Sequence, residues 1–439
     1  MFWFEIIIVL LAIFIGARLK GIGLGVMGGL GLAILTFGFH VPPTSPPVDV
    51  LLIIMAVVTA VGILESAGGL RYLVILGEKI IRKHPRQITF IGPLVTYLFS
   101  FLAGTSHICY SILPVIAEVA KETGIRPERP LSVSVTAAQQ AVTASPISAA
   151  TAILVGLLSP YGIELADILK VCVPATLGGV IVATIIANKM GKELHEDPAY
   201  LKKVGLSQKG QERQDAINYP VVSTSAKRSV VLLMIGILLI VLFGSFKGLR
   251  PTWEVNREVV VMNMTVIIEI IMLATAALIV LLCGVKPTKI VKGHVFIAGI
   301  QAVIAIFGIS WLGDTFFAQN TVQIMHIVQA YITAAPWQFS IFLFLLSVIV
   351  VSQAAAIRAL VPLGISLGIP AVALVAMFPA VNGLFFIPNH PAILAAINFD
   401  RTGTTRIGKF ILNHSFMVPG LVATTTAVLL GFGLIKLLF

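Results

Sequence analysis

The sequence predicts an all-α polytopic membrane protein, in which two inverted-topology repeats bring broken or re-entrant helices together near the bilayer midplane. Of its 439 residues, 58% are hydrophobic and only 11% are charged, against about 25% charged in soluble domains. Many apolar runs approach the ~20 residues that a helix needs to cross a bilayer. Two apolar stretches, 88–158 and 337–399, also hold prolines and polar residues. Lipid tolerates broken backbone only where it faces protein or a water-filled cavity.

The first 188 residues are expected to form an N-terminal transmembrane half. The opening apolar run, 2–17, is followed rather than preceded by basic residues. This is the reverse of a signal peptide, so we expect an uncleaved helix with a periplasmic N-terminus. The further segments expected here are helices at 21–39 and 48–64, an interfacial helix at 71–86, paired short limbs within 88–120, a crossing helix at 131–158 and a returning helix at 165–187. The G-x-G-x-x-G of Gly23, Gly25 and Gly28 lies inside a spanning run, which favours small-residue helix packing over a nucleotide fingerprint.

Residues 189–228 are the longest polar segment and are expected to be a cytoplasmic linker between two halves. Residues 229–439 then form the C-terminal transmembrane half. Its expected segments are helices at 229–246, 260–283 and 295–312, an outer interfacial helix at 321–334, paired short limbs at 337–351 and 354–368, a broken crossing helix at 370–399 and a last crossing at 410–439.

The charge and cysteine patterns exclude several classes of protein. The net charge is +11, but the basic residues stand in short loops beside apolar runs, where they orient helices in lipid rather than bind nucleic acid. Cys109, Cys172 and Cys283 are far apart and show neither metal spacing nor a disulfide framework. We therefore expect no nucleic-acid partner, no metal and no cofactor, with membrane lipid as the main environment.

The repeat units 88–158 and 337–399 share one layout. Each has two short limbs joined at small polar residues, followed by a crossing helix that is interrupted by a proline step. The joint-to-break separation is 40 residues from Thr105 to Ser145 and 37 residues from Ser352 to Asn389. Flanking charges start the first unit inside and the second outside, which predicts inverted repeats and the elevator architecture of ion transporters, with substrate bound between helix tips. The alternative is that these prolines and small residues serve packing alone.

The polar residues at the joints and breaks are the candidate substrate-binding residues. Helix N-termini carry free N–H donors and partial positive charge, which suit anions. The candidates are Thr105, Ser106, His107, Ser145, Ser148, Ser352, Gln353, Arg358, Asn389 and His390. Arg358 could grip a carboxylate through two parallel bonds, or it could snorkel to the surface or neutralise Asp314. Lone intramembrane histidines are often packing residues, so His107 and His390 are weaker candidates.

The scarcity of acids also favours an anion as the substrate. Asp314 and Asp400 are the only acids in the last 140 residues, whereas a proton or cation carrier would place acids at its joints. No nucleophile–base pair and no large soluble domain is evident, so neither an enzyme nor a sensor is favoured. A cation-coupled symporter of organic anions stays open, with Glu65 and Glu269 as its coupling acids.

Several long stretches resemble the Dcu family of bacterial anaerobic C4-dicarboxylate antiporters. They are GARLKGIGLGVMGGLGLAIL (16–35), ESAGGLRYLV (65–74), FLAGTSHICYSILPVIAEVA (101–120), RPERPLSVSVTAAQQAVTASPISAA (126–150), VSQAAAIRALVPLGISLGI (351–369) and NFDRTGTTRIGKFILNHSFMVPG (398–420). The likeness runs nearly end to end and looks closer to the aspartate- and fumarate-importing member. One departure is Asn389-His390, where the family has Thr-Tyr before the proline.

The resemblance implies an inner-membrane secondary transporter that exchanges fumarate, malate or aspartate for succinate during anaerobic respiration. Exchange of one dianion for another needs no coupling ion, which agrees with the missing acids. The preferred dicarboxylate and self-association into a homo-oligomer are left open by the sequence.

Overall fold

The computed structural model describes residues 1–19, 22–46, 48–197, 200–201, 222–255, 258–388, 390–410 and 412–439. Asn389 and most of the predicted linker, 189–228, therefore lie outside the described residues. The α-helices of the first half are α1 (Phe2–Leu19), α2 (Gly23–Ala33), α3 (Val48–Ser66), α4 (Gly69–Lys83), α5 (Ile88–Ala103), α6 (Cys109–Glu122), α7 (Glu128–Ala144), α8 (Ala149–Leu158) and α9 (Leu165–Ala187). Those of the second half are α11 (Thr224–Ser245), α12 (Met264–Cys283), α13 (His294–Ala334), α14 (Phe339–Val350), α15 (Gln353–Ser366), α16 (Ala371–Met377), α17 (Pro391–Phe399) and α18 (Met417–Leu438).

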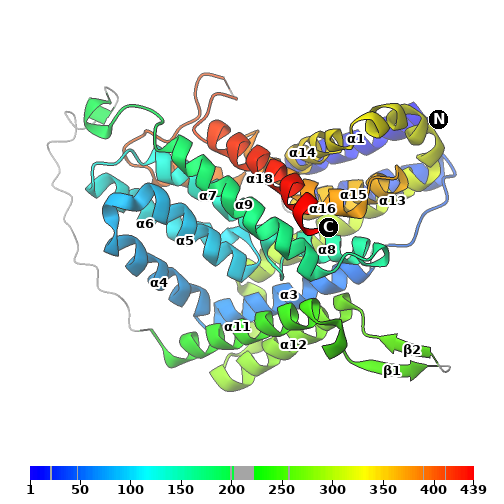
Figure 1. Cartoon of the computed structure of the whole chain (residues 1–439), viewed down its shortest axis with the longest axis horizontal. Coiled ribbons are helices and arrows are strands. Elements are labelled where there is room, and N and C mark those ends of the chain that lie inside the picture. The colour runs from blue at the N-terminus through cyan, green and yellow to red at the C-terminus, as the bar shows by residue number, and fades with distance from the viewer. Residues whose placement is uncertain are drawn as a thin grey trace.

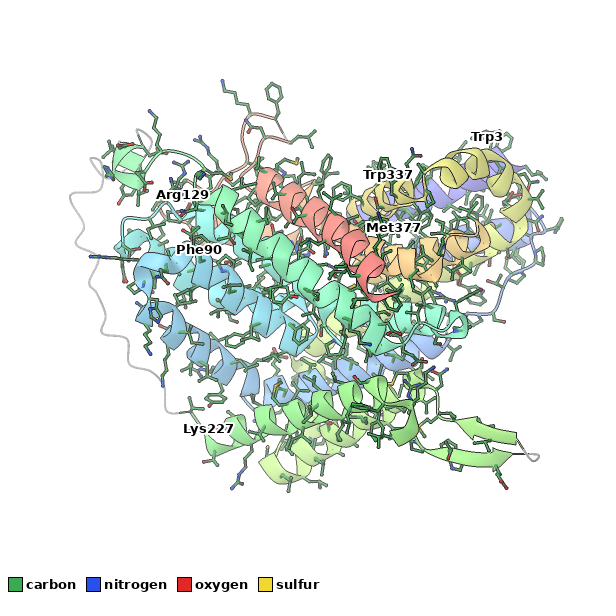
Figure 2. All side chains as sticks on the ribbon, in the orientation of Figure 1. Trp3, Phe90, Arg129, Lys227, Trp337 and Met377 are labelled. Atoms are coloured by element: carbon green, nitrogen blue, oxygen red, sulfur yellow. The ribbon has the colours of Figure 1, made fainter. Side chains whose placement is uncertain are left out.

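The chain is a multi-pass helical membrane protein, as the sequence predicts. Six helices in the described part are long and apolar enough to cross a membrane, or seven if α3 and α4, which meet at a 70° bend, form one broken span. Many large apolar side chains on the outer helices are exposed, for example Leu238 and Leu281, as a lipid-facing surface requires. Trp3 and Trp337 are exposed at the same edge of the molecule (Figure 2), which is typical of aromatic residues at a membrane interface.

The prediction of a purely helical fold was wrong at one place. Two short strands, β1 (Thr252–Val255) and β2 (Glu258–Val261), pair antiparallel, with Trp253 opposite Val260. These segments are rich in Val, Thr and Trp, which favour strands. The strand pair projects away from the helices beside α11 and α12 (Figure 1), and it leaves the helical body unchanged.

Two helix boundaries in the second half also differ from the predictions. The segments expected at 295–312 and 321–334 form one 41-residue helix, α13, because no proline interrupts the chain before Pro336. The last crossing begins at Met417 rather than at 410. The carboxylate of Asp400 accepts hydrogen bonds from Thr402 N (2.8 Å) and Thr405 N (2.6 Å), and such local bonds hold the chain in a non-helical loop.

The glycines of the G-x-G-x-x-G stretch bring α2 against α13. A Cβ on Gly25 would overlap the carbonyl of Ile304, and a Cβ on Gly28 would overlap the backbone of Gly308. Only glycine permits so close an approach of two helix backbones. The interpretation of this motif as a helix-packing motif is therefore confirmed.

The helices surround a central element, the broken helix α7–α8. In the span 128–161, the most apolar segment of 18 residues is 83% buried inside the protein. Helix α9 packs along α7 and α18, while α3 packs on α12 and α13, so elements from both halves of the chain enclose the centre (Figure 1). The polar groups of α7 and α8 are consequently shielded from lipid.

Candidate functional site

The two predicted joints between short limbs have the same backbone. Gly104 and Val351 both adopt the left-handed conformation, with φ of 65° and 51°. The next residue in each case is extended and accepts a hydrogen bond from the turn that follows. Thr105 accepts from His107 N at 3.3 Å in the 3₁₀ turn Ser106–Ile108 that precedes α6, and Ser352 accepts from Ala355 N at 3.2 Å in the first turn of α15. A left-handed β-branched residue such as Val351 is uncommon, so tertiary packing holds this joint in shape. Each second limb thus begins at a capped turn, which is a 3₁₀ turn before α6 and the first turn of the α-helix in α15.

The first crossing helix breaks where the sequence predicts. Helix α7 ends at Ala144 and α8 begins at Ala149, after Ser148 has accepted from Thr151 N at 3.1 Å. The hydroxyl of Ser145 donates to the carbonyl of Phe101 at 2.7 Å, which ties the break to the end of α5. The Ser145-Pro146 step therefore exposes a second helix N-terminus beside the first joint.

The second crossing helix has a longer break than the sequence predicts. The prediction centred it on 388–391, but α16 ends at Met377 and 3₁₀ turns follow over Phe378–Val381 and Gly383–Phe385. Pro379 lies in the first of these turns, because a proline cannot continue the hydrogen bonding of a helix. Helix α17 begins at Pro391, and its first turn is capped by His390, whose Nδ1 accepts from Ala392 N at 3.2 Å.

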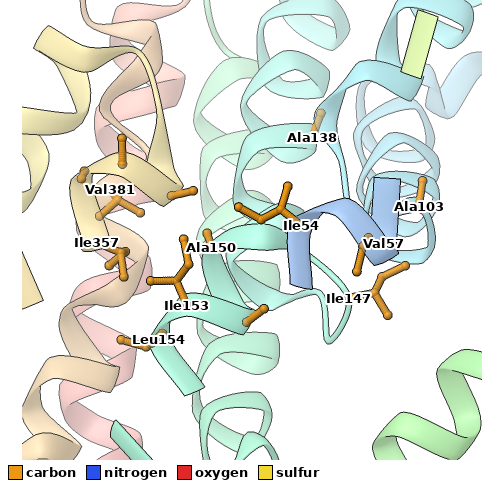
Figure 3. Packing of buried hydrophobic residues seen from close by; sticks show 14 of the residues in the cluster. Ile54, Val57, Ala103, Ala138, Ile147, Ala150, Ile153, Leu154, Ile357 and Val381 are labelled. Atoms are coloured by element: carbon orange, nitrogen blue, oxygen red, sulfur yellow. The ribbon is translucent and has the colours of Figure 1, made fainter. Parts of the chain in front are cut away.

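The four half-helices that begin at joints and breaks pack in two crossed pairs. Helix α6, from the first unit, packs on α17 of the second, and α8 of the first packs on α15 of the second. Figure 3 shows this second contact, with Ile153 and Leu154 of α8 beside Ile357 of α15. Each pair thus combines a half-helix from a joint with a half-helix from a break in the other unit.

A buried cluster of amides links the two units at their broken elements. We call it the amide cluster; it consists of Gln139, Gln140, Gln353 and Asn382, each at most 9% exposed. Gln353 Nε2 donates to the carbonyl of Gln139 at 2.9 Å and to the side chain of Asn382. Asn382 Nδ2 donates to Gln140 Oε1 at 3.0 Å and to Thr143 Oγ1 at 3.1 Å. Gln353 was predicted as a site residue, whereas Asn382 was missed, although an Asn between Pro379 and Gly383 in an apolar run was a usable signal.

One member of the amide cluster has unsatisfied polar atoms. Both Nε2 and Oε1 of Gln139 are buried and have no hydrogen-bond partner among the described residues. A buried polar group without a partner costs about 1–3 kcal/mol, and such a group in a native structure calls for an explanation. The side chain of Gln139 therefore has a free donor and a free acceptor at the meeting point of the two units.

His107 and His390 come from the two units, just before α6 and α17, and these two helices pack on each other. His107 is exposed, stacks on Tyr110 with ring centroids 6.0 Å apart, and follows Thr105 and Ser106 at the first joint. His390 is buried. No group of three His, Cys, Asp or Glu residues that could hold a metal occurs in the described ranges.

The whole chain, residues 1–439, matches the family model described as "Anaerobic c4-dicarboxylate membrane transporter". The chain belongs to this family. It is 41% identical over 433 residues to the C4-dicarboxylate transporter DcuA of Wolinella succinogenes, and 42% identical over 431 residues to DcuA of Escherichia coli K12; 98% of each chain is covered in both comparisons. The anaerobic C4-dicarboxylate transporter DcuB of Escherichia coli O6:H1 is 37% identical over 443 residues, again with 98% of each chain covered. The chain is accordingly a membrane transporter rather than an enzyme.

Solved transporters support the fold of this family member at low sequence identity. The YdaH transporter of Alcanivorax borkumensis superposes with a TM-score of 0.56 at 14% identity, over 96% of this chain and 99% of its own. The MtrF efflux pump of Neisseria gonorrhoeae gives a TM-score of 0.50 at 11% identity, over 93% and 84%. These likenesses concern the fold alone.

In this family member, Arg358 lies apart from the amide cluster. It follows Gln353 by five residues in α15, about 7.5 Å along the helix, and its Nη2 donates to Asp314 Oδ2 of α13 at 2.8 Å. Arg358 also lines a cavity of about 420 Å³ between α3, α8, α12 and α15, together with Asn263, Thr265 and Glu269. The neutralisation of Asp314, one of the two alternatives from the sequence, is therefore present, and contact with substrate stays a prediction.

The two predicted coupling acids have different surroundings. Glu65 Oε2 accepts from Val295 N at 3.1 Å, so it satisfies a free donor in the first turn of α13. Glu269 faces the cavity beside Arg358 and has an interaction of its own within the protein. Of the two acids, Glu269 is the one that lines this cavity.

Proposed function

We propose that this protein exchanges C4-dicarboxylates across the bacterial inner membrane, with fumarate, malate or aspartate entering and succinate leaving. Membership of the family and the names of its relatives support the class of substrate. The observation that carries the proposal is the meeting of the two units, in which four half-helices pack in two crossed pairs and an amide cluster contains an unpartnered Gln139.

The chemistry of this meeting point suits a small dianion. Helix N-termini attract carboxylates through their free N–H groups and their dipoles, and here they stand in two crossed pairs that match a ligand with two charged ends. Thr105, Ser106 and Ser352 would add hydroxyl donors, and His107 and His390 belong to the same proposed site. The side-chain donors of Ser145, Ser148 and Gln353 are used within the protein, so these residues would shape the site rather than donate to substrate. A bound carboxylate or its hydration water would satisfy the amide of Gln139.

The shared joint geometry and the crossed pairs also support an inverted repeat of 88–158 and 337–399. A rotation that exchanges the units would exchange α6 with α15 and α8 with α17, which maps one crossed pair onto the other. Broken helices that meet in this way place substrate near the midplane in secondary transporters. We propose that the two repeats move as one body against the remaining helices, with a periplasmic N-terminus and a cytoplasmic central linker.

Arg358 is proposed to bind one substrate carboxylate. It faces the cavity, and a guanidinium can donate two parallel hydrogen bonds to a carboxylate. Arg358→Ala should abolish dicarboxylate binding while the protein remains folded, and Arg358→Lys should restore it only in part because an ammonium lacks the planar fork. Unchanged binding in Arg358→Ala would assign Arg358 to Asp314 alone.

Counterflow in proteoliposomes tests the exchange itself. Vesicles that contain the purified protein and labelled succinate should release the label when fumarate is added outside. Acetate, which has a single carboxylate, should release none at the same concentration. Fumarate that stimulates no release from correctly inserted protein would refute the proposal.

A second candidate is a Na⁺- or H⁺-coupled symporter of small organic anions. The placement of Glu269 at the cavity beside Arg358 favours it, because an acid at membrane depth can carry a proton or bind a cation. Uptake by a symporter requires an ion gradient even when a counter-substrate is present. Counterflow that persists without Na⁺ and without a proton gradient, in wild type and in Glu269→Gln, would exclude this candidate.

The preferred dicarboxylate requires a direct comparison. The resemblance to the aspartate- and fumarate-importing member leads us to propose that aspartate competes with labelled fumarate. Asn389-His390 stands where the family has Thr-Tyr, so this turn is the first place to look for an altered preference. A competition panel of fumarate, malate, aspartate and succinate measures the order, and failure of aspartate to compete would contradict the assignment.

A further inference from the structure

The ion pair between Arg358 and Asp314 joins a half-helix of the repeat units to a surrounding helix. Asp314 is the only acid of α13, and it contacts the guanidinium through one hydrogen bond of 2.8 Å. Both side chains are largely buried, at 18% and 16% exposure. A buried charge that loses its partner is strongly destabilising, so Arg358 requires an anion in every state of the carrier in which it stays buried.

The contact with Asp314 uses only part of the guanidinium. Its Nε is buried and has no hydrogen-bond partner in the described structure, and the contact with Asp314 uses only Nη2. Arg358 also faces the cavity of about 420 Å³, which is within the ~300–1,000 Å³ typical of small-ligand sites. A substrate carboxylate in this cavity could therefore form the two parallel bonds that Asp314 does not form.

We infer that Asp314 competes with the substrate for Arg358. Asp314 binds Arg358 when no dicarboxylate is present and releases it when a dicarboxylate binds. The inference rests on the proposed function, because it takes Arg358 as a substrate contact. In the empty carrier the ion pair ties α15 to α13. Substrate binding neutralises Arg358 instead and releases α15.

This exchange of partners couples substrate binding to movement of the repeat units. If the repeat units are held in place when empty and released when a dicarboxylate is bound, they can cross the membrane only with a bound dicarboxylate. Transport in one direction then requires transport in the other, which is exchange. Two parallel bonds from Nε and Nη2 to a substrate carboxylate would occupy the Nη2 that Asp314 uses, so the two contacts exclude each other. Linkage between mutually exclusive contacts is reciprocal. Removal of the Asp314 carboxylate should therefore raise substrate affinity and free the empty carrier at the same time.

Asp314→Asn in proteoliposomes tests the inference by comparing two efflux rates. The unstimulated loss of labelled succinate should rise about fivefold or more over wild type, the lower end of typical coupling effects. The release stimulated by external fumarate should change little, so the ratio of the two rates falls. The Kd for succinate should fall by about fivefold or more for the same reason.

A control variant separates Asp314 from other carboxylates. Asp167→Asn removes a carboxylate that pairs with Lys170 of its own helix at 3.5 Å, and it should keep the wild-type ratio. A wild-type ratio in Asp314→Asn, or the same loss of coupling in Asp167→Asn, overturns the inference while leaving exchange intact. Absence of stimulation in the wild type refutes the proposed function, and the inference with it.

A second measurement keeps Asp314 in place and so does not depend on the folding of the variant. Spin labels at Val322 of α13 and Ser366 of α15, both exposed positions, report the separation of the two helices in an otherwise cysteine-free protein. Saturating succinate should shift the distance distribution, and a distribution that does not respond to succinate overturns the inference.

Discussion

Asn382 provides the sharpest test of the amide cluster. Its side chain is fully buried and bonds to Gln353, Gln140, Thr143 and the carbonyl of Pro379. Asn382→Leu removes all four bonds, but most of these partners keep another bond: Gln353 Nε2 still donates to Gln139 O, and Thr143 Oγ1 still donates to Gln140 O. The group left without a partner is Gln140 Oε1.

The expected loss of stability follows from that single orphaned acceptor. An unsatisfied buried acceptor costs about 1–3 kcal/mol, and the bulk of a leucine in a filled site adds about 1–3 kcal/mol. We therefore expect Asn382→Leu to destabilise the protein by roughly 2–5 kcal/mol. Exchange of succinate should fall with it, because the cluster positions the joint at Gln353.

A double-mutant cycle with Gln140→Leu isolates the hydrogen bond. The second substitution removes the orphaned acceptor, so the double variant should be more stable than the sum of the single effects by roughly 1–3 kcal/mol. Thermal unfolding in detergent at fixed lipid content measures the four stabilities. Additive effects within about 0.5 kcal/mol, or a single Asn382→Leu variant as stable as wild type, would refute the reasoning.

Three further predictions concern the joints and an extramembrane ion pair. Gly104→Ala should lower the thermal midpoint, by about 1–3 kcal/mol in stability, because its φ is 65° and a Cβ would lie 2.8 Å from Ile147 Cγ1; a midpoint equal to wild type would contradict this. Val351→Gly should raise stability or leave it unchanged, since relief of the left-handed conformation is worth about 1–2 kcal/mol; a marked loss in the same assay would show that the Val351 side chain outweighs its strain. Burial alone would raise the pKa of Glu164, but hydrogen bonds from Arg250 at 2.6 Å and Lys247 at 3.1 Å outweigh it and lower the pKa. The stability that this carboxylate contributes is therefore full above the ordinary glutamate pKa and is lost as the pH falls through the lowered value. The midpoint difference between wild type and Glu164→Gln should shrink in acid, and a difference that is constant from neutral pH into acid would contradict the assignment.

The sequence located the first broken helix well because its signal is local. Ser145-Pro146 interrupts an apolar run with a polar proline step, and the structure breaks the helix there. The second break was predicted only in part. Pro388 and Pro391 flank two polar residues and so gave the stronger local signal, whereas Asn382 is the single polar residue of 378–385, where the break begins. Both joints were predicted from small polar residues, although the left-handed Val351 has no local signature because packing alone imposes it.

Contacts between distant residues were the part that the sequence left undecided. Arg358 and Asp314 are 44 positions apart, and Gln140 bonds Thr424 from 284 positions away. Which face of α15 meets which helix depends on how all the helices assemble. The sequence could therefore state the alternatives for Arg358 without choosing between them, and it could not foresee the amide cluster that joins the two units.

The crossed pairs of half-helices have a consequence for the biogenesis of the protein. During synthesis, α6 and α8 enter the membrane well before their partners α17 and α15 have been translated. Until the second half has been translated, the side chain of Gln140 lacks both of its hydrogen-bond partners, Asn382 and Thr424, and hydrocarbon penalises unsatisfied polar groups heavily. The first repeat should therefore be a target of membrane quality control whenever synthesis stops inside the linker. Co-expression of the separate halves 1–201 and 222–439 should restore activity only if the first half escapes degradation until the second half has been inserted.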